Sequence, residues 1–449
     1  METVPGNRAI GASHRYQRHQ PENTSLHPIV EQHLPSLRDE LQRHETSLPR
    51  FVLTEFQDYL RCGRLEYGFL RVKCNGCRHE HLVAFSCKRR GFCPSCGARR
   101  MIETSAHLVD HVLPHQPCRQ WVLSFPWPLR LLFASQPEML SRVLKVVIRA
   151  IETVLIHRAG LTRSSRARTG VITLIQRFGS ALNLNIHLHM IVLDGVYVET
   201  AGRLRFHRVG APPRETLERL LGRIIRRTLR LLVRDGALIE EPDQPWLNLQ
   251  DPDTLDPLSA ASIRYRIALG PGAGQRTLTV RDPLLARPGS PASKPFTVNA
   301  DGFSLNAAVA CQAHERRRLE RLCRYITRPA ICLDRLSIHP DGRVTLRLKR
   351  PFSDGTTHIL FTAEDFLARL AALVPRPHHN LTRYHGVFAP SAPFRTRVTP
   401  AGAAARRRRA VAKTDRDEGC ESHAGKYDRT DELLAPLTWA PALAPGLRH

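Results

Sequence analysis

The sequence has no run of about 18 consecutive apolar residues and therefore offers no membrane-spanning helix. Its first segment, from Met1 to Gln20, lacks the apolar stretch of a signal peptide. It also lacks the G-x-x-x-x-G-K-S/T loop that cradles nucleotide phosphates, and internal repeats are not evident. These absences predict a cytoplasmic protein that has no membrane partner and does not hold nucleotide phosphates in such a loop.

Acidic residues are few relative to basic ones, with 41 Asp and Glu against 67 Lys and Arg, which gives a net charge of +26. A protein this basic most simply binds a polyanion. The excess is mostly arginine, whose planar guanidinium makes bidentate contacts with phosphate. Apolar residues make up 42% of the 449 positions, enough for a large core in two or three domains.

Hydrophobic periodicity predicts an α+β fold with an antiparallel sheet flanked by helices. Strands are expected at 121–125, 171–178 and 185–193, the last two as a hairpin, and a meander at 333–338, 343–349 and 356–361. Helices are expected at 27–60, 129–159, 214–234, 306–328 and 363–373.

The eleven cysteines are better explained as metal ligands or free thiols than as disulfides in a cytoplasmic protein. Two C-x-x-C knuckles stand 15 residues apart, which is zinc-ribbon spacing, and their thiolates complete a tetrahedral site. The sequence therefore predicts structural zinc held by Cys74, Cys77, Cys93 and Cys96. A redox role is the competing interpretation, and two knuckles at this spacing argue against it.

Two further cysteines and two histidines in the same segment are left over: Cys62, Cys87, His79 and His81. They form either a second zinc site or a set of buried thiols beside two unrelated histidines. Both interpretations remain open from the sequence.

A pair of histidines interrupts an apolar strand over 185–193. Because side chains alternate along a strand, His187 and His189 share one face, and Ile186 and Leu188 point the other way into a core. Two imidazoles on one rigid face are suited to hold a metal ion. Taken alone, the tripeptide fits better with two ordinary histidines on a half-exposed strand.

The helix expected at 306–328 carries a tyrosine among arginines. Tyr325 lies at the edge of the apolar face, and Arg318, Arg321 and Arg328 lie on the same side. Guanidiniums there would hold a phosphate and favour the phenolate, which suits a nucleophile for a phosphodiester. Taken alone, the pattern is better explained by a packing tyrosine on a basic helix.

Several longer stretches form a specific set of motifs. They include Cys87-Lys-Arg-Arg-Gly-Phe-Cys93, Trp121-Val-Leu-Ser-Phe-Pro-Trp-Pro-Leu-Arg130, Phe178-Gly-Ser-Ala-Leu-Asn-Leu-Asn-Ile-His187 and Tyr325-Ile-Thr-Arg-Pro329. With these, the chain resembles the rolling-circle insertion-sequence transposases, the IS ninety-one and ISCR group of bacterial HUH enzymes. The resemblance covers roughly residues 30–400.

The resemblance implies an HUH-endonuclease-like sheet and a metal-dependent cleavage of single-stranded DNA at element ends and target. His187 and His189 match the pair that holds catalytic Mg²⁺ or Mn²⁺, and Tyr325 matches the nucleophile that forms a 5′-phosphotyrosine link. A third ligand is usual in the family. Gln176 is the candidate, because a hairpin would set it diagonal to His187. The resemblance also implies a bacterial, nucleoid-associated protein of unknown oligomeric state.

The resemblance also suggests how the chain is divided. We expect a flexible arm at 1–25, a helix plus zinc-binding domain at 27–110, a catalytic domain at 118–398 with an insertion or loose subdomain at 240–305, and a basic, disordered tail at 399–449.

The chain departs from the family pattern in two places. Some members carry a second tyrosine four residues after the first, where this chain has Pro329, so it resembles the single-tyrosine branch. Members also continue past a Leu-Thr-Trp segment into another cysteine-rich ribbon. Here Leu437-Thr438-Trp439 is followed by only ten residues, as expected of a truncated copy.

Two alternatives stay open. A plasmid-type HUH replication initiator would use the same chemistry at an origin. A zinc-ribbon DNA-binding protein without catalysis would need neither the histidine pair nor Tyr325 for its function.

Overall fold

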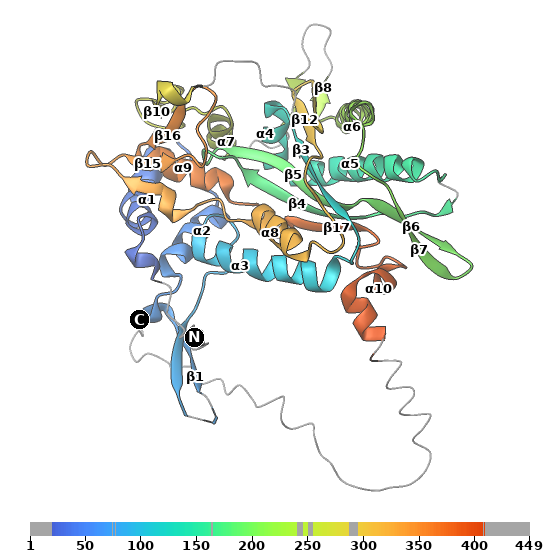
Figure 1. The fold of residues 1–449 in the computed structure, drawn as a ribbon. Helices are drawn as coiled ribbons and strands as arrows, with labels where there is room; N and C mark the ends of the chain where they lie inside the picture. The colour runs from blue at the N-terminus through green and yellow to red at the C-terminus, as the bar shows by residue number, and fades with distance from the viewer. Residues whose placement is uncertain are drawn as a thin grey trace, which may run out of the picture. The chain divides into compact units, whose positions relative to one another are not determined.

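The computed structural model of the chain describes residues 20–73, 75–76, 78–162, 165–239, 246–249, 255–286, 295–406 and 408. Contacts divide the chain into 1–402 and 403–449, and every element named below lies in the first unit (Figure 1). Cys74, Cys77, most of the expected arm at 1–25 and nearly all of the expected tail lie outside the described residues.

A seven-stranded antiparallel sheet forms the centre of the first unit (Figure 1). Its order is β11-β12-β3-β5-β4-β17, with β13 also beside β3. The strands are β3 (Cys118–Ser124), β4 (Gly170–Phe178), β5 (Leu184–Leu193), β11 (Thr297–Ala300), β12 (Phe303–Asn306), β13 (Ala310–Cys311) and β17 (Thr382–Gly386). The expected hairpin of 171–178 and 185–193 is confirmed as β4 and β5.

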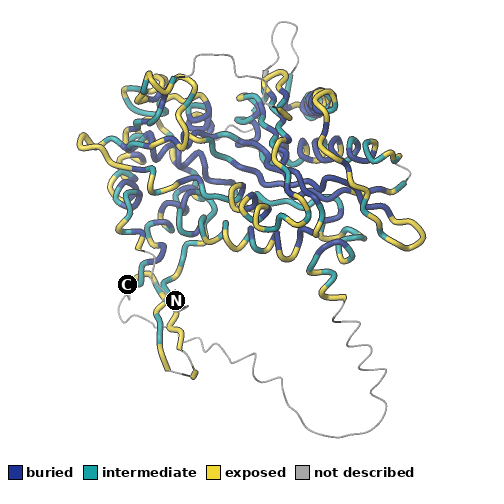
Figure 2. Tube along the Cα trace, viewed as in Figure 1, coloured by how far each residue is buried: buried dark blue, intermediate teal, exposed yellow. Residues whose placement is uncertain are grey.

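The two faces of this sheet pack against different helices. Ile186, Leu188 and Met190 belong to the larger core. The helices that help to bury this core are α4 (Trp127–Ser135), α5 (Pro137–Arg158), α6 (Arg214–Arg234), α7 (Leu255–Ile263) and α9 (Ala363–Leu373). Ile191 and Leu193 face a second core with α8 (Arg316–Thr327) and a π-helical turn at Leu108–Val112. Figure 2 shows the buried strands between exposed outer elements. The alternation predicted for the histidine strand is therefore correct.

Smaller strand pairs surround the central sheet. The expected meander is confirmed as β14 (Leu336–Ile338), β15 (Val344–Arg347) and β16 (Thr356–Phe361), joined by β10 (Leu278–Arg281). Three hairpins complete the set: β1 (Phe69–Lys73) with β2 (Glu80–Ala84), β6 (Gly195–Thr200) with β7 (Arg203–Arg208), and β8 (Leu238–Ile239) with β9 (Trp246–Leu247).

The N-terminal region is built from α1 (Leu26–Arg43), α2 (Arg50–Arg61) and α3 (Pro94–His107), and a short α10 (Arg395–Val398) closes the unit. The single helix expected at 27–60 is two helices, because the chain turns after Arg43 and Glu45 takes a positive φ of 54°, which a right-handed helix does not allow. The helix expected at 129–159 is divided at Gln136, because a helical conformation is disfavoured for the residue before a proline, here Pro137. α1 packs on α9, and α3 packs on α8.

Two other sequence expectations need correction. The helix expected at 306–328 begins only at Arg316, because Phe303 and Leu305 alternate into the core as strand residues of β12. The segment 240–305 is not a separate insertion in its described part. It supplies β10 to the small sheet and β11 and β12 to the central sheet. None of the described helices is long and apolar enough to cross a membrane.

Candidate metal centres and active site

Four cysteines come together where α2 and α3 meet. Cys62 follows the last residue of α2, Cys87 lies in the loop after β2, and Cys93 and Cys96 stand at the start of α3. Their sulfur atoms all lie within 4.8 Å of one another. Among the described residues, this is the one group of at least three cysteine, histidine or acidic side chains that could hold a metal ion.

The sulfur–sulfur distances fit a tetrahedral zinc site. They are 3.4 Å from Cys87 to Cys96, 3.7 Å from Cys62 to Cys96 and 3.8 Å from Cys93 to Cys62. Zinc–sulfur bonds of about 2.3 Å in a tetrahedron require sulfur–sulfur edges of about 3.8 Å. The arrangement therefore fits structural zinc.

Electrostatics also favour a cation at the four sulfurs. Hydrogen bonds from neighbouring thiols lower the pKa of Cys62 and Cys96, and the same contacts raise the pKa of Cys87 and Cys93. All four thiols can ionise together only when a cation offsets their mutual repulsion. The start of α3 adds a helix N-terminus, which also stabilises thiolate at Cys93 and Cys96.

This grouping shows a use of the cysteines that the sequence left open. Cys93 and Cys96 form the described cluster with Cys62 and Cys87, and Cys74 and Cys77 of the predicted quartet lie outside the described residues. His79 and His81 are not part of the sulfur cluster; their rings contact each other on the β1–β2 hairpin, 4.3 Å between centroids. Spacing could not distinguish these pairings, because C-x-x-C turns look alike in sequence and the fold chooses their partners.

The histidine site lies on adjacent central strands. Gln176 of β4 is directly opposite His187 of β5, so the predicted diagonal placement is wrong by two positions, although the predicted face is right. Ser124 and Val122 of β3 stand opposite His187 and His189 on the other side. The two imidazoles are 8% and 4% exposed, so they are held by the sheet rather than free in solvent.

Hydrogen bonds orient the potential ligand atoms. His187 Nδ1 donates to the carbonyl oxygen of Asn185 at 2.8 Å, which leaves Nε2 with a free lone pair. That Nε2 lies 3.1 Å from His189 Nε2, which in turn lies 3.3 Å from Gln176 Oε1. The amide nitrogen of Gln176 donates to the Ile326 carbonyl at 3.4 Å, and this contact turns Oε1 toward the histidines.

These three atoms fit one divalent ion. Bonds of about 2.1 Å at right angles, as in octahedral Mg²⁺ sites, place neighbouring ligand atoms about 3.0 Å apart, close to the observed 3.1 and 3.3 Å. Burial lowers the pKa of His187 to about 4 and that of His189 to about 3. Both imidazoles are therefore neutral near pH 7, the form that can bind a metal.

The tyrosine predicted as a nucleophile lies beside this site. The Tyr325 ring is perpendicular to the His189 ring, with 6.2 Å between centroids, and its side chain is 45% exposed. The Arg328 guanidinium lies 4.2 Å from the Tyr325 ring centroid and donates to Gln176 Oε1 at 3.3 Å. Lys349 places its ammonium 5.7 Å from the same ring centroid. Tyr325 thus stands between the potential metal ligands and two cations.

The other two predicted phosphate-binding arginines lie away from these contacts. Arg318 pairs with Glu315 at 2.9 Å, and Arg321 is exposed on α8. Of the three, Arg328 is the one whose described contacts include site residues.

Sequence reasoning missed Gln120. It lies on β3, is 4% exposed, and its amide contacts His189 Nδ1 at 2.8 Å. The available signal was a polar residue directly before the strand predicted at 121–125, in the alternation that puts Gln120 on the face opposite to Trp121 and Leu123.

The zinc-binding segment supports the end of the tyrosine helix. A side chain at Gly97 of α3 would place its Cβ 2.7 Å from the Pro329 ring, so glycine permits the close approach. Thr327 donates to the Met101 carbonyl of α3 at 3.5 Å. The cysteine cluster and Tyr325 are consequently linked through the α3–α8 contact.

Two family models match the chain. The family described as "Putative transposase" matches residues 170–395, which is half of the chain, and the family described as "Transposase zinc-binding domain" matches residues 29–125. No curated protein and no solved structure matches the chain.

The two matches together cover both the cysteine cluster and the histidine site, which defines a zinc-containing enzyme that processes DNA. The chain belongs to the IS ninety-one family of insertion-sequence transposases.

Proposed function

We propose that this transposase cuts and rejoins single-stranded DNA by HUH-type chemistry, through a covalent 5′-phosphotyrosine intermediate, during rolling-circle transposition. The observation that carries the proposal is the convergence of His187 Nε2, His189 Nε2 and Gln176 Oε1 beside Tyr325. Element ends and target, as single strands, are the proposed substrates.

The proposed metal ligands are His187, His189 and Gln176. A bound Mg²⁺ or Mn²⁺ supplies Lewis-acid polarisation of a phosphate oxygen. The protein contributes the neutral imidazoles that accept the ion and the buried strands that fix their positions. Gln176 adds a neutral oxygen ligand, and Arg328 on that same oxygen adds positive charge near the phosphate.

Tyr325 is the proposed nucleophile. Its hydroxyl oxygen forms a bond to phosphorus, the bond from phosphorus to the 3′ oxygen breaks, and the hydroxyl proton ends on that 3′ oxygen. The products are a 5′-phosphotyrosine and a free 3′-hydroxyl, so the energy of the phosphodiester is kept for rejoining. The cations of Arg328 and Lys349 beside the ring lie where they can offset the negative charge of the attacked phosphate in this step.

The test mixes the full chain with Mg²⁺ or Mn²⁺ and a labelled random-sequence pool of single-stranded oligonucleotides. We expect a covalent protein–DNA adduct with wild type and none with Tyr325→Phe, which removes only the hydroxyl. Tyr67→Phe, at an exposed tyrosine of the N-terminal region, is the matched control and should keep the adduct. An adduct that survives Tyr325→Phe would refute the nucleophile.

The same assay separates the alternatives. A plasmid-type initiator would form the adduct but prefer an origin strand over element ends. A non-catalytic DNA-binding protein would form no adduct in any variant.

A further inference from the structure

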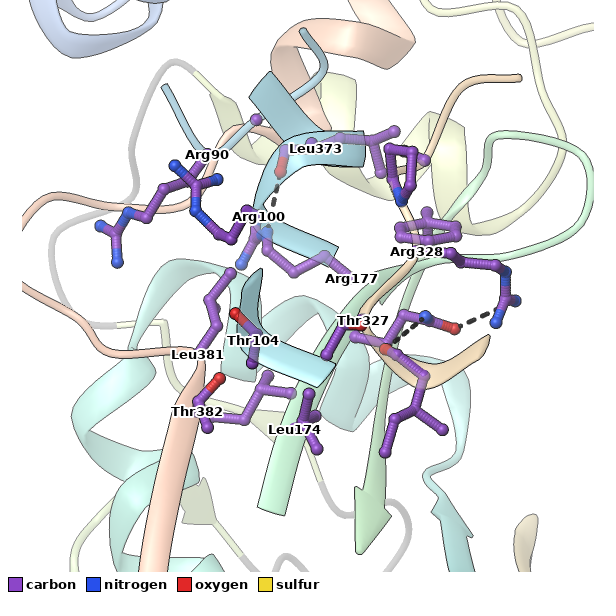
Figure 3. Close-up of a pocket in the computed structure, with 18 of the residues that line it drawn as sticks. Arg90, Arg100, Thr104, Leu174, Arg177, Thr327, Arg328, Leu373, Leu381 and Thr382 are labelled. Carbon is purple, nitrogen blue, oxygen red and sulfur yellow. Dashed lines mark hydrogen bonds between the residues drawn. The ribbon is translucent and has the colours of Figure 1, made fainter. Parts of the chain in front are cut away.

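A cavity of about 270 Å³ lies beside the candidate active site (Figure 3). Its walls come from the end of β4, the start of β17, the segment 326–330 after Tyr325, and α3 of the zinc-binding segment. Gln176 and Arg328 belong to both the cavity wall and the active site. A strand whose phosphate reaches Tyr325 therefore has a neighbouring nucleotide within reach of the cavity.

Three of the arginines that line the cavity donate to backbone carbonyls, and a fourth, Arg89, pairs with Asp58. Arg90 donates to His379 O at 2.6 Å and Arg100 to Lys88 O at 2.8 Å. Arg177 donates to Leu373 O at 3.1 Å (Figure 3). The described lining includes no aspartate or glutamate. The nearby carboxylate of Glu55 accepts a hydrogen bond from Gly91 N, and its single charge does not balance three guanidiniums.

Burial disfavours the charged form of several arginines that line the cavity. It lowers the pKa of Arg177 to about 10, and it also lowers the pKa of Arg90 and Arg328. Keeping several positive charges together in a partly buried place is costly unless an anion joins them. The cavity thus has the charge of a phosphate site.

The remaining walls suit a nucleobase rather than phosphate alone. Apolar side chains form one part of the wall: Leu174, Ile175, Phe178, Leu373 and Leu381. Hydroxyl and amide groups form another part: Thr104, Thr327, Asn380 and Thr382. A base has apolar faces and a hydrogen-bonding edge, and enzymes acting on nucleic acids bury such bases in pockets of this composition. The volume is near the lower end of the roughly 300–1,000 Å³ of ligand sites, enough for one nucleotide.

We propose that the cavity receives one nucleotide of the single strand next to the cleaved phosphodiester, with the base between the apolar walls and its phosphate on Arg90, Arg100 and Arg177. The inference rests on the proposed function, because it places the strand at Tyr325. It gives the enzyme a means to select its cleavage site by one base, since the polar wall groups contact the base edge.

The test fills the cavity from one wall. Thr104 lines it from α3, so Thr104→Trp occupies the space of the base. Glu103→Trp, at the neighbouring exposed position of α3, adds the same ring outside and is the control. The probe is an oligonucleotide with the sequence recovered most often in adducts, or a member of the pool when no adduct forms. A series of probes is made in which one position at a time lacks its base, and the affinity of the protein for each probe is measured without added divalent metal.

In wild type and Glu103→Trp, one abasic position next to the cleaved phosphate should weaken binding about tenfold. In Thr104→Trp the same abasic position should have no effect, because the cavity is already filled. Equal sensitivity in Thr104→Trp and wild type, or no sensitive position, would overturn the proposal.

Two further measurements complete the test. Arg90→Gln leaves the cavity open and should reduce the salt dependence of binding by about one phosphate contact; an unchanged salt dependence would contradict the phosphate role. Free deoxynucleoside monophosphates should compete only weakly, and tight binding that the oligonucleotide does not displace would mean a free nucleotide is the ligand. Normal adducts without abasic sensitivity would defeat the cavity proposal alone, and abasic sensitivity without adducts would defeat only the cleavage chemistry.

Discussion

The cysteine cluster and the proposed histidine site differ in the elements that position their ligands. The sulfur ligands come from a helix end, a loop and a helix start within 62–96, a region whose β1 strand is exposed along its whole length. The histidine site stands on β4 and β5, where neighbours such as Ile186 and Leu188 are fully buried in the main core. The cysteine cluster joins a loop and two helix ends that meet through side-chain contacts such as Arg89 with Asp58, whereas the histidine site is placed by paired strands of the central sheet.

The difference indicates a structural role for zinc at the cysteine cluster and a catalytic role for the metal ion proposed at the histidines. Around the sulfurs, a small aromatic group of Phe56, Tyr59 and Phe92 supplies the apolar packing, with ring centroids 4.7 and 5.5 Å apart. Around His187 and His189, hydrogen bonds from main chain and amides already hold the rings. Removing zinc should therefore unfold the region around the cysteines. Removing the ion proposed at the histidines should abolish activity and leave the fold intact.

The largest effect is expected at the sulfur cluster. Cys96→Ser replaces a thiolate by a poor zinc ligand, and structural zinc contributes about 10–16 kcal/mol of apparent binding energy in small zinc domains. We expect loss of one zinc per chain and unfolding of the region from α1 to α3, measured by metal analysis and limited proteolysis.

Cys332→Ser, at an exposed free cysteine, is the matched control and should keep its zinc. A Cys96→Ser protein that retains full zinc and protease resistance would show that the cluster is not a zinc site.

The second effect is expected at the histidines and on activity alone. His187→Ala removes one ligand atom, so metal-dependent adduct formation should fall about a thousandfold, since such an ion supplies several kcal/mol to the reaction. Zinc content and salt-sensitive DNA binding should stay near wild type. Cleavage that persists in this variant would place the catalytic metal elsewhere.

The sequence predicted the faces of the histidine strand better than the grouping of the cysteines, and the reason is geometric. On a strand, position alone decides the face, so His187, His189 and their apolar neighbours were assigned correctly. The partners of Cys93 and Cys96 depend instead on how α2 meets α3, which no local pattern encodes. The exact partner of Gln176 could not be predicted either, because a bulge between Gln176 and Phe178 shifts the register and no local pattern marks it.

The boundaries of the tyrosine helix were also beyond local reasoning. Residues 306–315 continue a helix-compatible composition, but Leu305 and Cys311 pack in two different cores as parts of β12 and β13. Tertiary contacts overrode the local preference there. Tyr325 and Arg328 were nonetheless placed correctly at the helix end, since their spacing from the apolar positions does not depend on where the helix starts.

A third prediction tests how the sheet prepares its histidines. Rotating the Gln120 amide by half a turn lets its oxygen accept from His189 Nδ1–H, which leaves Nε2 free for the ion. Gln120→Leu should weaken Mn²⁺ binding about 10- to 100-fold, measured by calorimetry, while Gln120→Glu keeps the acceptor and should restore it. Equal loss in both variants would mean that Gln120 serves packing alone.

The smallest effect is the acid response of the histidine site in protein free of divalent metal at that site. Burial lowers the pKa of His187 to about 4 and of His189 to about 3, against about 6.5 for histidine in an unfolded chain. Below pH 6.5 these histidines therefore bind protons in the unfolded chain but not in the folded one. The free energy of unfolding falls as the pH falls toward 4. Between pH 6.5 and 5.5 the loss is about 1 kcal/mol for each histidine.

Acid also protonates the zinc thiolates, so the comparison needs a variant that isolates the imidazoles. The double change His187→Gln and His189→Gln keeps polar side chains on the strand and removes both titrations. Urea unfolding of each protein at pH 6.5 and 5.5 should show a loss about 2 kcal/mol smaller in the double variant. The thiolates and the partly buried His385, whose pKa burial also lowers to about 4, remain in both proteins. Equal losses would therefore show that the imidazoles of His187 and His189 are not held neutral by the sheet.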